Sequence, residues 1–496
     1  MSKSTHHRDR LPALTSRLRA RYPLVSLVHS DEADALRWLA EAAAQAELEL
    51  VTVRYGDADP APLAALALTE LVARPPSVLA LPWGHRLLED LGFVRLLAET
   101  LIELERAGHV VVLHGPAAPP CPELDRDRVI LTLPLPGPGE LGPLCAAALR
   151  GPDGAEPHPD DLQATVQALA GLTTGQARRA LRRLRGRLPR DLAELRAEKR
   201  DLVAQGGLLD LVTEVPGLAD LGGLDELKDW LLRRRAAFSA EARAFGLPAP
   251  RGVLVVGVQG CGKSVACKAA ASALGLPLVR LDLGRLHAGG LGPDANLRHA
   301  LQIAEAMAPC VLWLDELDKA FAHALTGGSE TGARMLGSLL TWLGEQRGVF
   351  VAASANRVDH LPAELLRKGR FDETFFVDVP DVTVRAEILA VHLRHSGRDP
   401  AGYDVPRLAK AAERLTGAEI EQALLEALAQ AFAEARELAE ADLLGALSKT
   451  VPLVETYEPQ VKALREWARR RCRPAQRDRS LRDLYEGALA SRKEPL

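Results

Sequence analysis

A glycine-rich run between an apolar segment and a helix-forming segment constrains this chain more than any other feature. The run is Gly257-Val258-Gln259-Gly260-Cys261-Gly262-Lys263-Ser264, with apolar residues 252–256 before it and helix formers at 265–274 after it. Such a strand–loop–helix turns successive backbone N–H groups toward one anion, and the helix N-terminus adds partial positive charge there. The sequence therefore predicts a phosphate-binding loop in a parallel α/β sheet, because a chance glycine turn rarely matches every position of this motif.

The same loop predicts which residues contact a nucleoside triphosphate and its metal ion. Lys263 is expected to reach the β- and γ-phosphates, and the Ser264 hydroxyl is expected to ligate Mg²⁺. The predicted nucleotide contacts in this region are Gly257, Gly260, Cys261, Gly262, Lys263, Ser264 and Val265.

Two acids follow a second apolar segment. Residues 310–314 are apolar and lead directly to Asp315 and Glu316. Because ligands gather at the carboxyl ends of parallel strands, these acids are expected to lie beside the phosphates. Asp315 would hold Mg²⁺ through water, and Glu316 would polarise the attacking water. The plain alternative, a buried strand with a solvated acidic turn, is weaker after a phosphate-binding loop.

A third apolar segment and a basic segment complete this set. Residues 349–355 lead to Asn356, whose side chain could orient the water or touch the γ-phosphate. Arg367 and Arg370 then lie on either side of Lys368-Gly369. They are either surface cations or guanidinium groups that stabilise transition-state charge, often from a neighbouring subunit.

The order of these motifs resembles that of the AAA+ ATPases, in the branch that carries two arginine fingers. The resemblance covers about residues 218–447 and implies an ATPase core with a helical lid, which binds ATP and Mg²⁺ at a subunit interface. Residues 220–224 resemble the segment whose backbone reads adenine, with Leu221 and Gly222 as contacts. Residues 416–420 resemble the lid motif in which Gly417 and Ala418 pack beside the nucleotide.

A narrower resemblance spans most of the chain. Residues 222–238, 340–343 and 464–468 are similar to one AAA+ family of cyanobacteria, algal chloroplasts and other bacteria. Its cyanobacterial members are linked to regulation of carbon dioxide uptake. The resemblance implies that link without naming a direct client.

The first two hundred residues predict a second α/β domain without catalytic residues. Short apolar runs begin near Leu24, Leu48, Val78, Val110 and Val129, and helical segments alternate with them. This alternation predicts a parallel sheet. No Gly-Lys-Ser/Thr follows the first run and no Asp-Glu follows the third, so we expect a degenerate AAA+-like domain that serves in docking. An unrelated α/β adaptor is the alternative.

Composition suggests four segments in a soluble cytoplasmic protein. They are a degenerate AAA+-like domain with a small helical subdomain (1–205), an ATPase core (206–380), a helical lid (381–450) and a basic helical tail (451–496). The net charge of −4 gives no overall attraction to nucleic acid or to anionic membranes. No apolar run reaches the length of a membrane span, and the six cysteines lack metal-ligand spacing.

Two segments, the expected pore loop and the arginine-rich tail, give only weak indications of function. Residues 284–294, where translocating relatives carry an aromatic pore loop, contain no aromatic residue, and His287 is the nearest candidate. This departure argues against threading of a polypeptide. The tail is rich in arginine, but acids are interspersed, so a solvated or inter-subunit helix is favoured over a nucleic-acid surface.

Cys261 is an unusual residue in a phosphate-binding loop. A thiol near a helix N-terminus can have a lowered pKa, which predicts that alkylation or oxidation there blocks ATP binding. A small buried residue without reactivity is the alternative.

The sequence thus predicts a Mg²⁺-dependent ATPase that remodels or regulates an unidentified protein partner. It is expected to form an ATP-dependent oligomer, with a hexamer as one form. A slow nucleotide-dependent switch or scaffold is the first alternative, and a nucleic-acid remodeller is the second.

Overall fold

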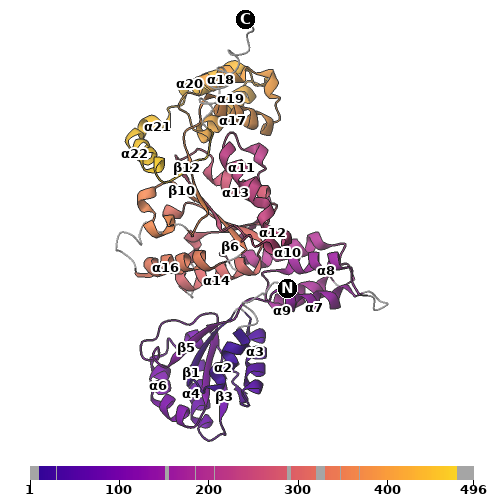
Figure 1. Cartoon of the computed structure of the whole chain (residues 1–496), viewed down its shortest axis with the longest axis vertical. Helices are drawn as coiled ribbons and strands as arrows, with labels where there is room; N and C mark the ends of the chain where they lie inside the picture. The colour runs from indigo at the N-terminus through magenta and orange to yellow at the C-terminus, as the bar shows by residue number, and fades with distance from the viewer. Residues whose placement is uncertain are drawn as a thin grey trace. The chain divides into compact units, whose positions relative to one another are not determined.

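The computed structural model describes residues 10–29, 31–150, 156–184, 186–205, 207–287, 292–319, 330–346, 348–367 and 369–477. Contacts group the 496-residue chain into two compact units (Figure 1). The first contains Met1–Gly206 with Ala288–Met307, and the second contains Gly207–His287 with Ala308–Leu496. Each unit contains one β-sheet.

The sheet of the first unit is parallel and has the strand order β2-β3-β4-β1-β5. Its strands are β1 (Leu24–Val28), β2 (Glu49–Thr52), β3 (Ser77–Leu81), β4 (Val110–Gly115) and β5 (Arg128–Thr132). Leu24 of β1 pairs with Val111 of β4 on one side and with Arg128 of β5 on the other. Every residue of β3 and β4 is buried, as expected for apolar strands covered on both faces.

Helices cover both faces of this sheet, because connections between parallel strands cross over a face. They are α2 (Arg10–Arg19), α3 (Glu32–Gln45), α4 (Pro60–Leu71), α5 (Gly84–Leu87) and α6 (Leu91–Arg106). Helices α2 and α3 pack against Val25 on one face, and α4 and α6 pack against Leu24 on the other. Asp31 caps α3, since its carboxylate accepts hydrogen bonds from the N–H groups of Ala33 and Asp34.

A group of helices follows this sheet in the first unit. They are α7 (Pro138–Leu149), α8 (Pro159–Leu169), α9 (Thr174–Arg183) and α10 (Leu192–Gln205), and α14 (Pro293–Ala306) is grouped with the same unit. Helices α7 and α10 both pack against α8. Thr173 and Gln176 form a reciprocal capping box that starts α9. Helices α7 to α10 lie within the predicted first segment (1–205), whereas α14 lies within the predicted ATPase core (206–380).

The second unit contains a seven-stranded sheet in the order β12-β11-β7-β10-β9-β8-β6. Its strands are β6 (Leu209–Val212), β7 (Gly252–Gly257), β8 (Leu278–Leu281), β9 (Cys310–Leu314), β10 (Val349–Ala355), β11 (Glu373–Val377) and β12 (Arg473–Pro474). Strand β6 is antiparallel to β8, and the other pairs are parallel. When β7 is counted as the first strand and β11 as the fifth, the five central strands have the order 5-1-4-3-2. The first sheet has the same order.

Helices also pack on this second sheet. They are α11 (Asp225–Arg235), α12 (Ala240–Phe245), α13 (Lys263–Leu274) and α16 (Glu330–Glu345), with 3-10 turns η1 (Leu218–Asp220), η2 (Ala236–Phe238), η3 (Leu283–His287), η4 (Val358–His360) and η5 (Ala363–Leu366). Trp230 of α11 is 1 % exposed and lies with its ring centroid 5.7 Å from that of Phe375 and 6.3 Å from that of Phe350. These aromatic contacts attach α11 to the sheet.

A helical region and an edge strand complete the second unit. The region consists of α17 (Val382–His395), η6 (Pro400–Gly402), α18 (Val405–Ala411), α19 (Gly417–Ala433) and α20 (Glu440–Lys449), followed by α21 (Leu453–Thr456) and α22 (Glu458–Arg469). Helices α17 to α20 share their own apolar core. Within the described part of the predicted tail, the last helix ends at Arg469, and residues 478–496 lie outside the described residues. Strand β12 then pairs with β11, because that edge offers unpaired backbone groups.

This architecture confirms the predicted fold class. A parallel sheet flanked by helices leads into a helical region, and an α/β domain precedes both. Among the described residues, no helix combines the length and the apolar character needed to span a bilayer.

Candidate functional site

The predicted phosphate-binding loop joins the end of β7 to the start of α13. A Cβ atom on Gly257 would lie 2.0 Å from the Val377 carbonyl oxygen. Gly260 has a φ of +76°, and a Cβ atom there would lie 2.9 Å from Thr416 Oγ1. Only glycine fits these positions without displacing its neighbours. Helix α13 begins at Lys263 without a side-chain cap, so its first N–H groups face the loop as an anion site requires.

Lys263 has its side chain folded over this loop. The residue is 5 % exposed, and its Nζ donates to the carbonyl oxygens of Gly257 (3.0 Å) and Val258 (2.7 Å). Desolvation by burial lowers the pKa of Lys263, because a buried ammonium has lost its water. A phosphate held by the loop would offset that loss with opposite charge.

Ser264, Asp315 and Ser354 form a hydrogen-bonded cluster beside the loop. Both hydroxyls donate to Asp315 Oδ1, from Ser264 at 2.8 Å and from Ser354 at 2.5 Å. Hydroxyl and carboxylate oxygens are the ligands that Mg²⁺ prefers, so these residues fit the ion. Ser354 was not predicted from the sequence, where its only signal was a hydroxyl in an otherwise apolar strand.

Glu316 and Asn356 are brought together as predicted. Asn356 Nδ2 donates to Glu316 Oε1 at 3.3 Å, and Lys319 Nζ lies 2.7 Å from the same carboxylate. Glu316 has a φ of +50°, which is rare outside glycine and is found preferentially at functional sites. Asp318, which the sequence analysis missed, is 2 % exposed and accepts a hydrogen bond from the Asn356 N–H at 3.1 Å.

The predicted lid motif contacts the phosphate-binding loop directly. The Ala418 N–H donates to the Gly260 carbonyl oxygen at 2.9 Å. A Cβ atom on the neighbouring Gly417 would lie 3.4 Å from the same oxygen. Thr416 and Glu419 form a capping box that starts α19 at this point, so the helix is fixed where it meets the loop.

The predicted adenine-reading segment, residues 220–224, lies beside the lid. Leu221 is 7 % exposed and belongs to the same apolar core as Cys267 of α13. A Cβ atom on Gly222 would lie 2.9 Å from the Ile388 backbone nitrogen in α17, and Ile388 also approaches Gly417. The structure therefore brings this segment, the phosphate-binding loop and the lid motif together. Val265 lies in the first turn of α13 and is 38 % exposed.

Arg367 and Arg370 lie after η5 and before β11. Arg367 is exposed and Arg370 is partly buried, with its guanidinium group against Gly344 of α16. Neither arginine forms an ion pair within the described ranges. Asp372 of the same segment accepts hydrogen bonds from the N–H groups of Arg251 (2.7 Å) and Gly252 (3.1 Å), which anchors the segment to the start of β7.

The predicted low pKa of Cys261 is wrong. Desolvation by burial raises the pKa of this thiol to about 12, and the positive charge of Lys263 only partly opposes that effect. The nearby helix N-terminus does not compensate for the loss of water. Cys261 is half-buried, and its raised pKa fits the alternative of a residue without reactivity.

The described residues include only the two ends of the predicted pore-loop segment, residues 284–294. Turn η3 ends at His287, and residues 288–291 lie outside the described residues.

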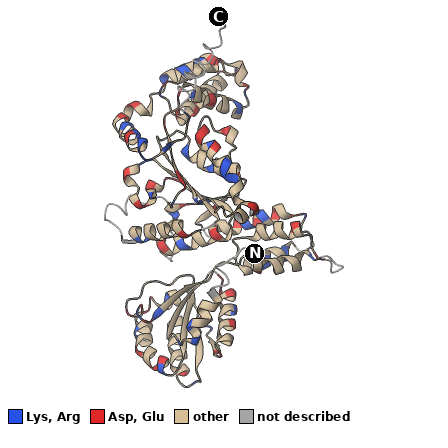
Figure 2. Cartoon of the chain, in the orientation of Figure 1, with Lys and Arg blue, Asp and Glu red and all other residues tan. Residues whose placement is uncertain are grey.

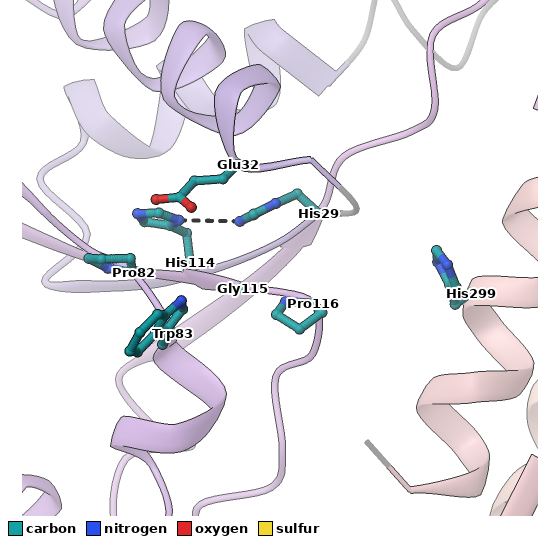
Figure 3. Close-up of a pocket in the computed structure, with 8 residues that line it drawn as sticks. All are labelled: His29, Glu32, Pro82, Trp83, His114, Gly115, Pro116 and His299. Atoms are coloured by element: carbon teal, nitrogen blue, oxygen red, sulfur yellow. Dashed lines mark hydrogen bonds between the residues drawn. The ribbon is translucent and has the colours of Figure 1, made fainter. Parts of the chain in front are cut away.

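The corresponding edge of the first sheet carries other chemistry. His29 follows β1, His114 is near the end of β4, and Trp83 follows β3, all beside a pocket of about 270 Å³ (Figure 3). His29 Nε2 and His114 Nδ1 lie 3.2 Å apart, and the Glu32 carboxylate lies next to His114 (Figure 3). Asp31 occupies the N-terminus of the following helix with its own carboxylate, where a phosphate would otherwise bind.

Burial keeps His29 and His114 neutral near pH 7. It lowers the pKa of His29 to about 4, partly opposed by Asp31, and it lowers the pKa of His114 to about 4. An edge with neutral imidazoles and acids does not attract a triphosphate. The loss of nucleotide binding in the first domain stays a prediction.

Several described arginines of the basic tail pair with neighbouring acids. Arg465 pairs with Asp378 at 2.9 Å, and Arg477 Nε donates to Glu226 Oε1 at 2.8 Å. Blue basic and red acidic residues are interspersed along the helices (Figure 2). This pattern disfavours the nucleic-acid interpretation, which needs a surface dominated by cations.

Models of two known protein families match the chain. Residues 253–379 match the ATPase family associated with various cellular activities (AAA). Residues 11–133 match the N-terminal domain of SpoVK-like AAA ATPases. The two matches cover the two sheets separately.

Similar proteins cover most of the chain. It is 34 % identical over 473 residues to the AAA domain-containing protein ycf46 of Guillardia theta, an alignment that covers 91 % of this chain and 93 % of that protein. The ycf46 protein of Trieres chinensis is 33 % identical over 473 residues, 91 % and 95 % of the two chains. The ATP-dependent zinc metalloprotease FtsH of Caldicellulosiruptor bescii is 37 % identical over 223 residues, 42 % of this chain and 35 % of that protein. These names do not mention carbon dioxide uptake, so that part of the resemblance stays a prediction.

Proposed function

The chain belongs to the AAA ATPase family, together with the ycf46 AAA domain-containing proteins, and we propose that it hydrolyses ATP with Mg²⁺ to change the conformation of a protein partner. One observation carries the proposal. At the carboxyl edge of the second sheet, Ser264 and Asp315 share a 2.8 Å hydrogen bond beside the phosphate-binding loop, and Asn356 bonds to Glu316 next to them. Charge stabilisation and positioning are what phosphoryl transfer requires.

The loop and the serine–aspartate pair bind the substrate and the metal in this proposal. The N–H groups of the loop and the Lys263 ammonium hold the β- and γ-phosphates. Ser264 and Asp315 hold Mg²⁺, which supplies positive charge to the phosphate oxygens when bound. Ser354 orients the Asp315 carboxylate through its 2.5 Å hydrogen bond.

Glu316 acts on the attacking water. Its carboxylate accepts the proton of that water as the oxygen approaches the γ-phosphate. Asn356 and Lys319 both bond to this carboxylate and fix its position. Their contacts favour an activating role for Glu316 over a solvated acidic turn.

The two arginines act on a neighbouring copy of the chain. Arg367 is exposed, and neither it nor Arg370 has an ionic partner among the residues described. A guanidinium without a partner in its own chain suits donation to a γ-phosphate in another subunit. The proposal therefore includes an ATP-dependent oligomer with ATP at the subunit interface.

A slow nucleotide-dependent switch is the second candidate. Residues 284–294 contain no aromatic residue that could grip a polypeptide. The corresponding edge of the first sheet carries neutral histidines and acids. Both features favour docking and assembly over the threading of a polypeptide. The ion pairs of tail arginines with Asp378 and Glu226 disfavour the third candidate, a nucleic-acid remodeller. The cytoplasmic location remains a prediction from the sequence, and the link to carbon dioxide uptake remains a prediction from the family resemblance.

Phosphate release by the full chain tests the proposal. With ATP and Mg²⁺ we expect steady release, and with EDTA we expect none, because the metal neutralises phosphate charge. Lys263→Ala is the matched control for contaminating ATPases. Release by that variant at the rate of the unaltered protein would overturn the proposal. A rate well below one turnover per minute that rises on assembly would instead favour the switch.

A further inference from the structure

The segment Arg473–Arg477, here called the C-terminal strap, closes one edge of the second sheet. Strand β12 pairs Phe375 with Arg473 and Phe376 with Pro474. The Ala475 N–H donates to the Phe376 carbonyl oxygen at 2.9 Å, and Ala475 is fully buried. The strap is thus a packed part of the fold, although it lies about 100 residues beyond the strand that it joins.

The strap caps the N-terminus of α11. Leu224 stands at the N-cap position of this helix and has no oxygen in its side chain, so it cannot satisfy the first N–H groups. The Ala475 carbonyl oxygen accepts from Glu226 N–H at 3.0 Å and from Leu227 N–H at 3.2 Å. A distant backbone carbonyl therefore replaces the usual capping side chain.

Charges hold the strap to the same helix turn. Arg473 and Arg477 both donate to the Glu226 carboxylate, and Arg477 also pairs with Asp229. The hydrogen bonds from Arg477 and Arg473 lower the pKa of Glu226. These ion pairs are partly exposed, so they fix the geometry of the strap more than they stabilise the fold.

Gln476 links this junction to the adenine-reading segment and to the lid. Its Oε1 accepts from the Leu224 N–H at 3.1 Å, and its Nε2 donates to Asp381 Oδ2 at 3.4 Å. Asp381 caps α17, the first lid helix, by accepting from Val384 N–H at 2.9 Å. Helix α17 also bonds directly to the adenine-reading segment, since the Gly223 N–H donates to Glu387 Oε2 at 2.7 Å.

We propose that the C-terminal strap positions the adenine-reading segment against the lid, with Gln476 as the positioning residue that sets affinity and selectivity for the adenine base. The proposal rests on the ATPase function proposed above. The strap touches the backbone at Leu224, two residues after Gly222, and it does not contact the phosphate-binding loop in any hydrogen bond of the described residues. Its loss should therefore weaken recognition of the base and leave the phosphate contacts in place.

The test compares binding of ADP and GDP to two truncated chains by calorimetry. Truncation after Cys472 removes the strap, and we expect ADP to bind about tenfold more weakly, with little change for GDP. Truncation after Arg477 keeps every strap contact described above and should bind like the full chain. Equal ADP binding by both truncated chains would overturn the proposal, as would an equal loss for ADP and GDP, which indicates general destabilisation.

A point variant keeps the proposal testable if the first truncated chain does not fold. Gln476→Ala should bind ADP about threefold more weakly, with little change in GDP binding, so its preference for ADP over GDP decreases. Its far-UV circular dichroism should stay unchanged. Arg469→Ala is the matched control, because the ion pair that Arg469 forms among the described residues is with Glu466 of its own helix. Unaltered selectivity in Gln476→Ala would overturn the role of this residue. If the full chain binds no nucleotide, the ATPase proposal itself fails and the strap proposal fails with it.

Discussion

In the first sheet, β1 ends at Val28 and leads into His29, whereas in the second sheet the corresponding strand β7 ends at Gly257 and leads into a phosphate-binding loop. Both sheets place these strands at the same point of a 5-1-4-3-2 order. One edge has neutral histidines beside acids, and the other has Lys263 beside serine and carboxylate oxygens. The comparison teaches that strand order determines where a ligand can bind, while a few side chains at that edge determine which ligand it is.

The largest effect should come from the arginines of the second unit. Arg370→Ala should lower kcat at least about 1,000-fold, because a guanidinium stabilises the transition-state charge. If it acts between subunits, mixing this variant with Glu316→Gln should restore about a quarter of the unaltered rate, since some interfaces regain both groups. A mixture as inactive as its components would contradict action between subunits. The readout is phosphate release.

Glu316→Gln should separate binding from turnover at the same edge. The amide cannot accept a proton from water, so we expect turnover to fall about 100-fold or more while ATP binding is retained. The variant should also assemble in the presence of Mg-ATP, which sedimentation or mass photometry would measure. Turnover close to that of the unaltered protein would refute the proposed role. A monomer that binds ATP tightly would favour the switch.

Lys263→Ala tests whether the two edges differ as their side chains suggest. Loss of the ammonium should weaken ATP binding roughly 100-fold, because a charge-assisted contact to phosphate disappears. His29→Ala at the corresponding position of the first sheet is the matched variant and should leave ATP binding unchanged. Weaker ATP binding in His29→Ala would show that the first edge also contributes to the nucleotide site.

The smallest effect concerns the histidine pair of the first sheet. In the folded state the pKa values of His29 and His114 are about 4, below the usual 6.5, so the unfolded chain binds more protons between these values. Stability of this domain should therefore fall as the pH drops from 7 to 5, by about 2 kcal/mol for one histidine. Hydrogen exchange of the backbone amides in β1 and β4 would measure this loss of stability, after correction for the pH dependence of the intrinsic exchange rates. His114→Gln should reduce the pH dependence, and an unchanged dependence would contradict this origin.

Much of the catalytic edge could be predicted because its motifs are local in sequence. The loop from Gly257 to Ser264 and the pair Asp315-Glu316 each follow an apolar strand, and parallel strands bring their carboxyl ends together. The roles of Ser354 and Asp318 were missed, since each is a single polar residue whose partners come from another strand. Cys261 was misjudged because its pKa depends on burial, which no local pattern reports.

The fold class, the alternation of strands and helices and the residues of the phosphate-binding loop follow from the amino-acid sequence alone. They depend on apolar periodicity and on short-range backbone geometry. In contrast, it is the folded chain that shows residues 473–477 as a strap and not as part of a helical tail. Its contacts join positions about 250 residues apart, from Gln476 to Leu224 and from Arg477 to Glu226. Such contacts satisfy backbone N–H and C=O groups that are left unpaired at an open strand edge and at an uncapped helix N-terminus. These unpaired groups come together only once the sheet is assembled.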